Sequence, residues 1–306
     1  MRTGAARDHV GYYHETAFYG SDTEFQALVV PFLDEGVAAG EPVLVACCET
    51  NERLLRDRVA DVSGIRFLPG ADHYSRPTDA ILTYRKLFAE YSGAPQIRVV
   101  GDVPHPGVGA AWDWWSRYEA AVNEVFGDYA LWGLCPYDLR TTPPGVVADV
   151  LHAHPHVAGV GANPDYLGSW TWPDPVPDPL EAEPPLVDLG DPSPAEARHA
   201  VSAACVATRL LRDELDDIIY AASEAVTNAI THGKPPVRLR VWADAEHVVV
   251  AVSDRGEGPG SPVVGLVPTS QTTSAGLGLW LTHRTCRGVS MYRDANGYTI
   301  RLVVGG

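Results

Sequence analysis

The chain has 306 residues, enough for two domains, and its formal net charge is −16, with 39 Asp and Glu against 23 Lys and Arg. This balance leaves no basic surface for phosphate backbones, so direct binding of nucleic acid is not expected. Five cysteines without a C-x-x-C pair argue against a disulfide framework or a standard zinc motif, and the absence of a signal peptide or long apolar run predicts a soluble cytoplasmic protein with no membrane segment.

Residues 1–167 alternate strand and helix signals and are predicted to form one α/β domain. Strands are predicted at 42–48, 96–102 and 129–135, helices at 25–36 and 111–126, and an Arg-rich amphipathic segment at 51–62. This βαβ order predicts a parallel sheet, whose ligands usually collect at the carboxyl ends of the strands. The phosphate-binding pattern G-x-x-x-x-G-K-[ST] is missing from this domain.

Residues 168–192 are predicted to be a linker. Proline alternates with acidic residues over Trp170–Pro185, and residues 166–192 contain six Asp or Glu and no Lys or Arg. Such a segment cannot form a helix and is expected to be extended and semi-rigid. Its acidic residues could fold over and mask basic residues in the domain that follows.

Residues 193–306 are predicted to be a second domain. Ser193, Pro194 and Glu196 mark the start of a helix that is expected to continue to about Leu215. A second helix contains residues 222–231, and strands are expected at 237–243, 247–254 and 298–304. With a glycine-rich loop and another helix between the last two strands, this order predicts an α/β sandwich that has its helices on one face of a mixed sheet.

The second helix carries three polar residues at four-residue intervals. The stretch A-S-E-A-V-T-N-A-I-T-H-G places Glu224, Asn228 and His232 on one stripe. The apolar stripe that should face the core is formed by Ala225, Val226, Ala229 and Ile230. The polar stripe must be satisfied by side chains, by water or by a ligand.

Two later segments favour a nucleotide ligand. D-R-G-E-G-P-G follows a strand and S-A-G-L-G-L-W opens a helix. The amide oxygen of Asn228 suits Mg²⁺, Glu224 can deprotonate a hydroxyl, and Asp254 can accept a hydrogen bond from an adenine amine. Gly256 and Gly258 permit close approach to a ring, whereas Gly276 and Gly278 leave amide groups for phosphate at a helix N-terminus.

These residues resemble the GHKL (Bergerat-fold) ATPase family. E-x-x-x-N matches the N box of the family, D-x-G-x-G its first glycine box and G-L-G-L its second, which includes Leu277. The region around Glu224–Gly233 most closely resembles anti-sigma factor serine kinases of the RsbW and SpoIIAB type, and the resemblance covers about residues 186–306. It implies ATP and Mg binding, with Asn228 on the metal, Glu224 as catalytic base, Asp254 on adenine and Thr299 supporting Asp254.

The role of His232 stays open between ligand contact and a core or cap position. The resemblance also implies partners: an alternative sigma factor, held partly through Arg198 or His199 on the first helix, and a STAS-type anti-anti-sigma protein as the phosphate acceptor. Arg198, Arg209 and Arg212 are expected near one face of that helix, where a solvated surface is the alternative to a partner contact. A sensor histidine kinase would need a helical segment with a phosphoacceptor histidine in place of the linker.

The first domain resembles the MEDS sensory domain, which is similar to RecA/KaiC-type sheets. The resemblance spans about residues 9–166 and rests on His14-Glu15, Phe18-Tyr19, residues 31–46, R-x-x-G-D-x-P, R-Y-E-A-A-V-N, C-P-Y-D and His154-Pro155. Asp102 stands where the family usually has Glu, and Tyr118 where it has His. A ligand-sensing role for a small-molecule effector is implied, with a changed pocket.

Seven polar residues of the first domain are predicted to lie at strand ends or on an adjacent helix, where they could bind a small polar effector; they are His14, Arg98, Asp102, Glu119, Asn123, Asp138 and His154. A structural network around the turn at residues 135–138 is the alternative. A metal site of Cys135, His14 and His154 is a third option, although the spacing is not diagnostic.

The sequence therefore predicts a cytoplasmic anti-sigma factor that binds ATP and Mg under the control of a sensory domain. The competing interpretation is a non-enzymatic sensor in which the nucleotide fold serves only to dock a partner. Whether the chain forms a homodimer is left open.

Overall fold

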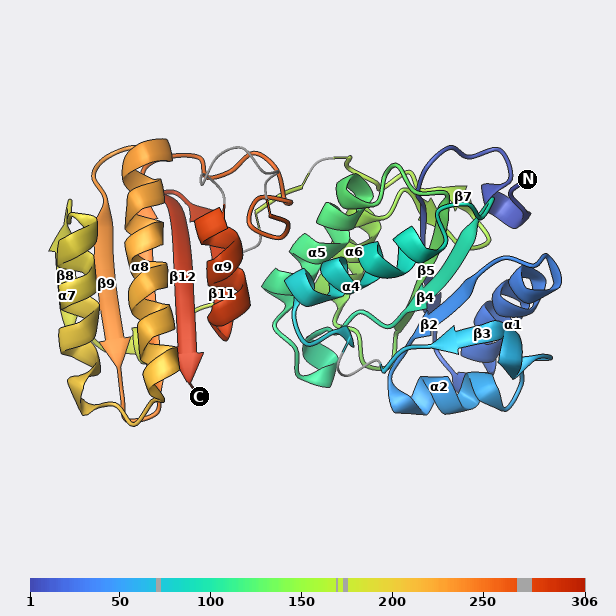
Figure 1. Ribbon diagram of the computed structural model, residues 1–306, viewed down its shortest axis with the longest axis horizontal. Helices are drawn as coiled ribbons and strands as arrows, with labels where there is room; N and C mark the ends of the chain where they lie inside the picture. Colours follow the sequence, from blue (N-terminus) through green and yellow to red (C-terminus); the bar gives the residue numbers. More distant parts are fainter. Residues whose placement is uncertain (70–72, 169, 173–175, 269–276, 306) are drawn as a thin grey trace. The chain divides into compact units, whose positions relative to one another are not determined.

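The computed structural model describes all residues except 70–72, 169, 173–175, 269–276 and 306, and it divides the chain into two units, Met1–Trp170 and Thr171–Gly306. Each unit has a sheet of its own (Figure 1). No helix among the described residues combines the length and the apolar character that crossing a bilayer requires.

The first unit is built on a seven-stranded sheet in the order β3-β2-β4-β5-β1-β6-β7. All neighbouring strands are parallel except β6 and β7. The strands are β1 (Tyr13–Tyr19), β2 (Val43–Ala46), β3 (Ile65–Phe67), β4 (Ile97–Gly101), β5 (Leu131–Asp138), β6 (His156–Val157) and β7 (Gly161–Ala162). The helices are α1 (Asp22–Ala38), α2 (Glu49–Arg56), α4 (Pro77–Glu90), α5 (Trp112–Val125) and α6 (Pro144–Ala153).

Alternation along the strands gives this sheet two different faces. Val100 and Trp132 belong to an apolar core with Phe25 of α1 and Leu55 of α2. The opposite face carries His14 and Cys135, along with the residues that face α4 and α5. Helices therefore cover both faces, and the predicted parallel-sheet α/β domain is confirmed.

The second unit has a five-stranded antiparallel sheet in the order β11-β12-β10-β9-β8. The strands are β8 (Val187–Gly190), β9 (Arg238–Ala243), β10 (His247–Asp254), β11 (Gly288–Asp294) and β12 (Gly297–Gly305). The helices are α7 (Pro194–Ala204), α8 (Arg212–His232) and α9 (Leu277–Thr285), and residues of all three pack on the core of one sheet face (Figure 1). The predicted α/β sandwich is confirmed, with a sheet that is antiparallel throughout.

The first helix of this unit ends earlier than predicted, at Ala204 instead of near Leu215. Buried Cys205 begins a short 3₁₀ turn, and the Thr208 hydroxyl donates to the Cys205 carbonyl oxygen at 2.8 Å, where the chain becomes extended. The Glu214 carboxylate then accepts from the Leu211 backbone N–H at 2.9 Å and starts α8. Arg198, Arg209 and Arg212 therefore do not share one helix, which corrects the predicted basic face.

The segment predicted as a linker contributes to the second sheet. Val187–Gly190 forms the edge strand β8, and Leu180 in the 3₁₀ helix η4 (Pro179–Ala182) packs against the sheet face opposite the helices. Three acidic side chains pair with sheet residues: Asp178 with His247 at 3.3 Å, Glu181 with Arg301 at 2.9 Å, and Asp188 with Arg238. These acids contact the sheet and not the arginines of α7 and α8, so the predicted masking of those arginines is not seen among the linker residues that the structure describes.

Candidate functional site

Helix α8 presents the polar stripe that the sequence singles out. Glu224 and Asn228 are half-buried, whereas His232 is exposed. Ala225, Val226 and Ala229 are in the core as predicted, but Ile230 is 55% exposed. Ile230 lies about 140° around the helix from Ala225, at 100° per residue, and so falls at the solvent border of the apolar stripe.

A cavity of about 380 Å³ opens beside this stripe. Its size lies within the range of about 300–1,000 Å³ that is usual for small-molecule sites. Four predicted residues line it: Asn228, His232, Asp254 and Gly258. The remaining lining comes from Ala225, Ala229, Gly233, Val252, Pro259, Val264, Leu279, Tyr298 and Ile300, so an apolar wall surrounds a few polar groups.

Asp254, at the end of β10, is the buried anion of the cavity, with only 5% of the residue exposed. Its Oδ1 accepts hydrogen bonds from the backbone N–H groups of Lys234, at 3.0 Å, and Gly256, at 2.6 Å. Within the described part of the chain, Oδ2 accepts no hydrogen bond. A carboxylate oxygen without a donor, on a largely buried residue that lines the cavity, suits a ligand amine, such as the exocyclic amine of adenine.

Glycines allow the backbone to approach Asp254 and the cavity wall. Gly258 has φ +71°, and a Cβ there would lie 2.5 Å from the Tyr298 ring. A Cβ at Gly256 would lie 2.6 Å from Asp254 Oδ1, and one at Gly233 would lie 2.5 Å from the same atom. Sequence reasoning assigned no role to Gly233; its place directly after the helix was the available signal.

Glu224 lies beside the first turn of α9. A Cβ at Gly278 would come within 2.8 Å of the Glu224 Cδ, so a side chain there would displace the Glu224 carboxylate from its present position. Leu277 is 43% exposed at the start of the same helix. Gly276 lies outside the described residues. Asn228 lines the cavity, and Glu224 stands one turn before it, next to α9.

Thr299 does not join this group. It pairs in register with Ser253 and Tyr292, and strand alternation places its side chain on the sheet face opposite Tyr298 and Ile300, which line the cavity. Thr299 and Asp254 both line a second pocket at this end of the sheet, so a supporting role of Thr299 for Asp254 stays a prediction. Its neighbour on that face is Arg301, which pairs with Glu181.

The predicted partner residues lie on the surface of α7. Arg198 and His199 are both exposed, and the Arg198 guanidinium donates to the Ser223 hydroxyl of α8 at 2.7 Å. Arg198 therefore links the two helices as well as facing solvent.

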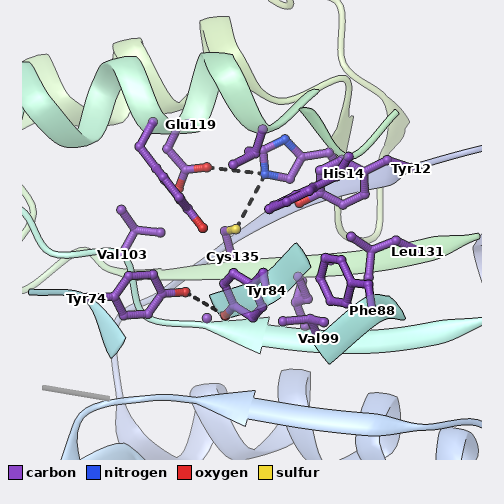
Figure 2. Close-up of a pocket in the computed structure, with 16 residues that line it drawn as sticks. Tyr12, His14, Tyr74, Tyr84, Phe88, Val99, Val103, Glu119, Leu131 and Cys135 are labelled. Carbon is purple, nitrogen blue, oxygen red and sulfur yellow. Dashed lines mark hydrogen bonds and ion pairs between the residues drawn. The ribbon is translucent and has the colours of Figure 1, made fainter. Parts of the chain in front are cut away.

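The seven polar residues predicted for the first unit separate into three places. His14, Glu119, Asn123 and His154 come together on the sheet face that is covered by α5 and α6. Cys135 joins them, and Figure 2 shows it beside His14 and Glu119. Beside them is a cavity of about 20 Å³, enough for about one water molecule, lined mainly by tyrosine and apolar side chains.

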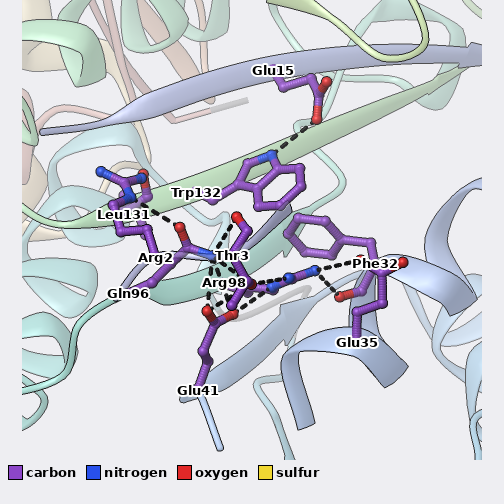
Figure 3. A network of polar contacts seen from close by, with 10 residues as sticks. All are labelled: Arg2, Thr3, Glu15, Phe32, Glu35, Glu41, Gln96, Arg98, Leu131 and Trp132. Atoms are coloured by element: carbon purple, nitrogen blue, oxygen red, sulfur yellow. Dashed lines mark hydrogen bonds and ion pairs between the residues drawn. The ribbon is translucent and has the colours of Figure 1, made fainter. Parts of the chain in front are cut away.

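Arg98 belongs to a separate buried network, near the amino end of β4 (Figure 3). Its guanidinium donates to the Glu41 carboxylate at 2.7 Å, the Phe32 carbonyl oxygen at 2.6 Å and the Thr3 hydroxyl at 2.7 Å. It also lies 4.6 Å from the centre of the Trp132 ring. Arg98 and the cluster around His14 face opposite sides of the sheet because β4 and β5 alternate, so one effector pocket cannot contain both.

The other two predicted residues are engaged locally. Asp102 accepts from the Asn51 side-chain amide at 2.8 Å and the Cys48 backbone N–H at 3.1 Å. Asp138 pairs with exposed Arg140 at 2.7 Å, and this pairing holds the pKa of the Asp138 carboxyl below its ordinary value. These two residues form turn and surface contacts and do not line the cavity beside His14.

Burial sets the charge of the cluster. It lowers the pKa values of His14 and His154 to about 3, so both imidazoles are neutral at physiological pH. It also raises the pKa values of the Glu119 carboxyl and the Cys135 thiol. Glu119 Oε1 accepts from the Tyr137 hydroxyl at 2.6 Å, while Oε2 accepts no hydrogen bond from the described residues.

The order of helices and strands around the larger cavity defines the second unit as a GHKL-type α/β sandwich. Comparison with protein families agrees: residues 192–304 match the histidine kinase-like ATPase domain, which implies nucleotide binding. Residues 13–155 match MEDS, the methanogen/methylotroph, DcmR sensory domain. The chain therefore combines an N-terminal MEDS domain with a C-terminal histidine kinase-like ATPase domain. No curated protein matches it.

Proposed function

We propose that this protein is an anti-sigma factor whose ATPase domain binds Mg·ATP and phosphorylates a Ser or Thr of a STAS-type protein, under control of the sensory domain. The observation that carries the nucleotide assignment is Asp254, buried in a cavity with one carboxylate oxygen left for a ligand donor. The E-x-x-x-N pattern on α8 supports the kinase assignment, and the two family matches support the pairing of sensor and effector domains.

Each residue then has a chemical task. Asp254 Oδ2 accepts from the adenine amine, and the glycines at 233, 256 and 258 keep side chains out of the path of the base. Asn228 offers its amide oxygen to Mg²⁺, which offsets phosphate charge when bound. Glu224 takes the proton from the acceptor hydroxyl, and Gly278 leaves room for its carboxylate.

Calorimetry with Mg·ATP tests the binding site. Asp254→Asn replaces part of an acceptor with a donor in a buried position and should weaken ATP binding about tenfold to a hundredfold, the effect of about 1–3 kcal/mol for a mismatched buried polar group. Asn228→Ala should weaken Mg·ATP more than metal-free ATP. Asp244→Asn, an exposed aspartate in the β9–β10 turn, is the matched control. Unchanged affinity in both site variants would refute the assignment.

A second assay separates binding from chemistry. Glu224→Gln keeps the size of the side chain but removes the base, so phosphorylation of a STAS protein should fall by about 10²–10⁴-fold while ATP affinity is retained. Equal rates in variant and parent would refute the catalytic role. ATP binding by the parent with no transfer to any STAS protein from the same cell would instead favour the docking-scaffold function.

The sigma-factor surface is tested at Arg198. Arg198→Ala removes both the exposed charge and the bond to Ser223, whereas Ser223→Ala removes only the bond. If Arg198 contacts sigma, the first variant should weaken sigma binding and the second should not. Equal binding by Arg198→Ala and the parent would exclude this residue from the partner surface.

A further inference from the structure

The four side chains of the buried cluster in the sensory unit bring metal-binding atoms to one point. His14 comes from β1, Cys135 from β5 and Glu119 from α5, and His154 follows the end of α6. One ligand atom from each lies within 4.8 Å of the other three. All four residues are buried, with no exposure at His14, Glu119 and His154 and 8% at Cys135.

Three of the six distances between ligand atoms match a tetrahedral site. His14 Nε2 lies 3.3 Å from Glu119 Oε2 and 3.5 Å from Cys135 Sγ, and His154 Nε2 lies 3.6 Å from Glu119 Oε2. Bonds of about 2.0–2.3 Å from a central zinc ion require ligand atoms about 3.3–3.7 Å apart. The remaining pairs need movements of about 1 Å or less to meet this range.

Hydrogen bonds outside the cluster orient both imidazoles for ligation. Asn123 Nδ2 donates to the Ala153 carbonyl oxygen at 2.8 Å, so Asn123 Oδ1 is the atom that faces His14 Nδ1, at 3.0 Å. His154 Nδ1 faces the Val150 carbonyl oxygen at 2.7 Å. Since both of these oxygens only accept, each Nδ1 carries the hydrogen and each Nε2 presents a lone pair. This arrangement is usual for metal-bound histidine.

Two atoms of the cluster lack a hydrogen-bond partner among the described residues. The lone pairs of His14 Nε2 and His154 Nε2 point toward Glu119 Oε2, and neither Glu119 Oε2 nor His154 Nε2 forms a hydrogen bond within the described part of the chain. Acceptor atoms this close need a cation or a proton between them. A divalent ion held by one thiolate and one carboxylate is electrically neutral overall, which lowers the cost of burying it.

We propose that this cluster is a transition-metal site of the sensory unit, in which His14, Glu119, Cys135 and His154 bind a divalent ion with tetrahedral preference such as Zn²⁺. The N₂SO ligand set suits borderline ions better than Mg²⁺ or Ca²⁺, which prefer oxygen ligands. Three of the ligands, His14, Glu119 and Cys135, also line the small cavity, which leaves room beside them for the small movements that an ion requires. Asn123 and Tyr137 are positioning residues that orient His14 and Glu119.

Co²⁺ is the probe, added to the full-length protein after a chelator has removed any bound metal. We expect one equivalent to give the visible absorption of tetrahedral cobalt and a near-ultraviolet thiolate-to-cobalt band, both bleached by Zn²⁺. Cys135→Ser should lose the thiolate band. Cys47→Ser, a cysteine equally buried in the same unit, should keep it and serves as the matched control.

Asn123→Ala should keep the spectrum but weaken Co²⁺ binding about 10–100-fold, because only the orientation of His14 is lost. Should Cys135→Ser fail to fold by circular dichroism, His154→Gln provides the same test through loss of tetrahedral absorption. The proposal is overturned if the parent shows no cobalt absorption, if the thiolate band survives Cys135→Ser, or if it disappears in Cys47→Ser. None of these measurements involves ATP, so they are independent of the proposed kinase function.

Discussion

The buried pair of Arg98 and Glu41 allows a quantitative prediction about the sensory unit. Both side chains are essentially inaccessible, and the other carboxylate near Arg98, that of Glu35, is 3.7 Å away and 63% exposed. Arg98→Met leaves the Glu41 carboxylate buried with hydrogen bonds from the neutral side chains of Thr3 and Gln96, and with Arg2 as a remaining positive charge near it. Removing one partner of a buried ion pair costs about 3–5 kcal/mol.

The stability lost in Arg98→Met should be large compared with the total free energy of unfolding of a domain, which is about 5–15 kcal/mol. Replacing both charges, in Arg98→Met with Glu41→Leu, should recover most of it, because the uncompensated charge is gone. Hydrogen exchange with mass spectrometry would measure the opening free energy in peptides from β4 and β5, and peptides from β10 and β12 provide the internal control. A single variant within about 1 kcal/mol of the parent, or a double variant no more stable than the single one, would refute this reasoning.

Two further predictions concern the second unit. Gly233→Ala should lower the stability of the second unit by about 1–3 kcal/mol and weaken ATP binding, because the added Cβ overlaps the Asp254 carboxyl. Gly260 has open space around it, so Gly260→Ala should leave the stability, measured by denaturation, and the ATP affinity, measured by calorimetry, unchanged. Trp242→Phe removes the 2.8 Å hydrogen bond from the indole N–H to the Glu183 carbonyl oxygen. It should therefore speed limited proteolysis of the segment that follows residue 175. An unchanged cleavage rate would show that this hydrogen bond does not hold that segment in place.

Most of the fold could be predicted because local patterns and tertiary structure agree. The strands at 97–101 and 131–138 are mostly apolar, apart from Arg98 and the terminal Asp138, and α7 begins with the capping box that Ser193 and Glu196 indicate. The end of α7 at Ala204 could not be predicted from local patterns, because it depends on the burial of Cys205 within a sequence that still favours helix. Strand β8 was missed because proline and acidic residues dominate the composition around it.

The candidate site residues that could be predicted are likewise those that lie in local sequence patterns. Asn228 and Asp254 lie in short sequence motifs, which can be identified without knowledge of the tertiary structure. The structure brings both residues to one cavity. Arg98 was grouped with His14 because both were expected near strand ends, yet which face a side chain takes depends on register, and a shift of one residue reverses it. The proposed metal ligands are up to 140 residues apart, from His14 to His154, so their spacing is not diagnostic; the sequence offered Cys135, His14 and His154 as one option among three and did not add Glu119 to them.

The route of the chain as it enters the second unit has a mechanical consequence. Trp172 packs on Tyr298, 5.2 Å between ring centres, and a Cβ at Gly258 would lie 2.7 Å from the Trp172 ring. Fifteen residues after Trp172 the chain begins β8, which is hydrogen-bonded to β9. β9 in turn pairs with β10, the strand that ends in Asp254. Tension on the segment that joins the two domains would therefore act on the wall of the nucleotide cavity and on the edge of the sheet at the same time. This connecting segment is thus also a part of the structure that it could control.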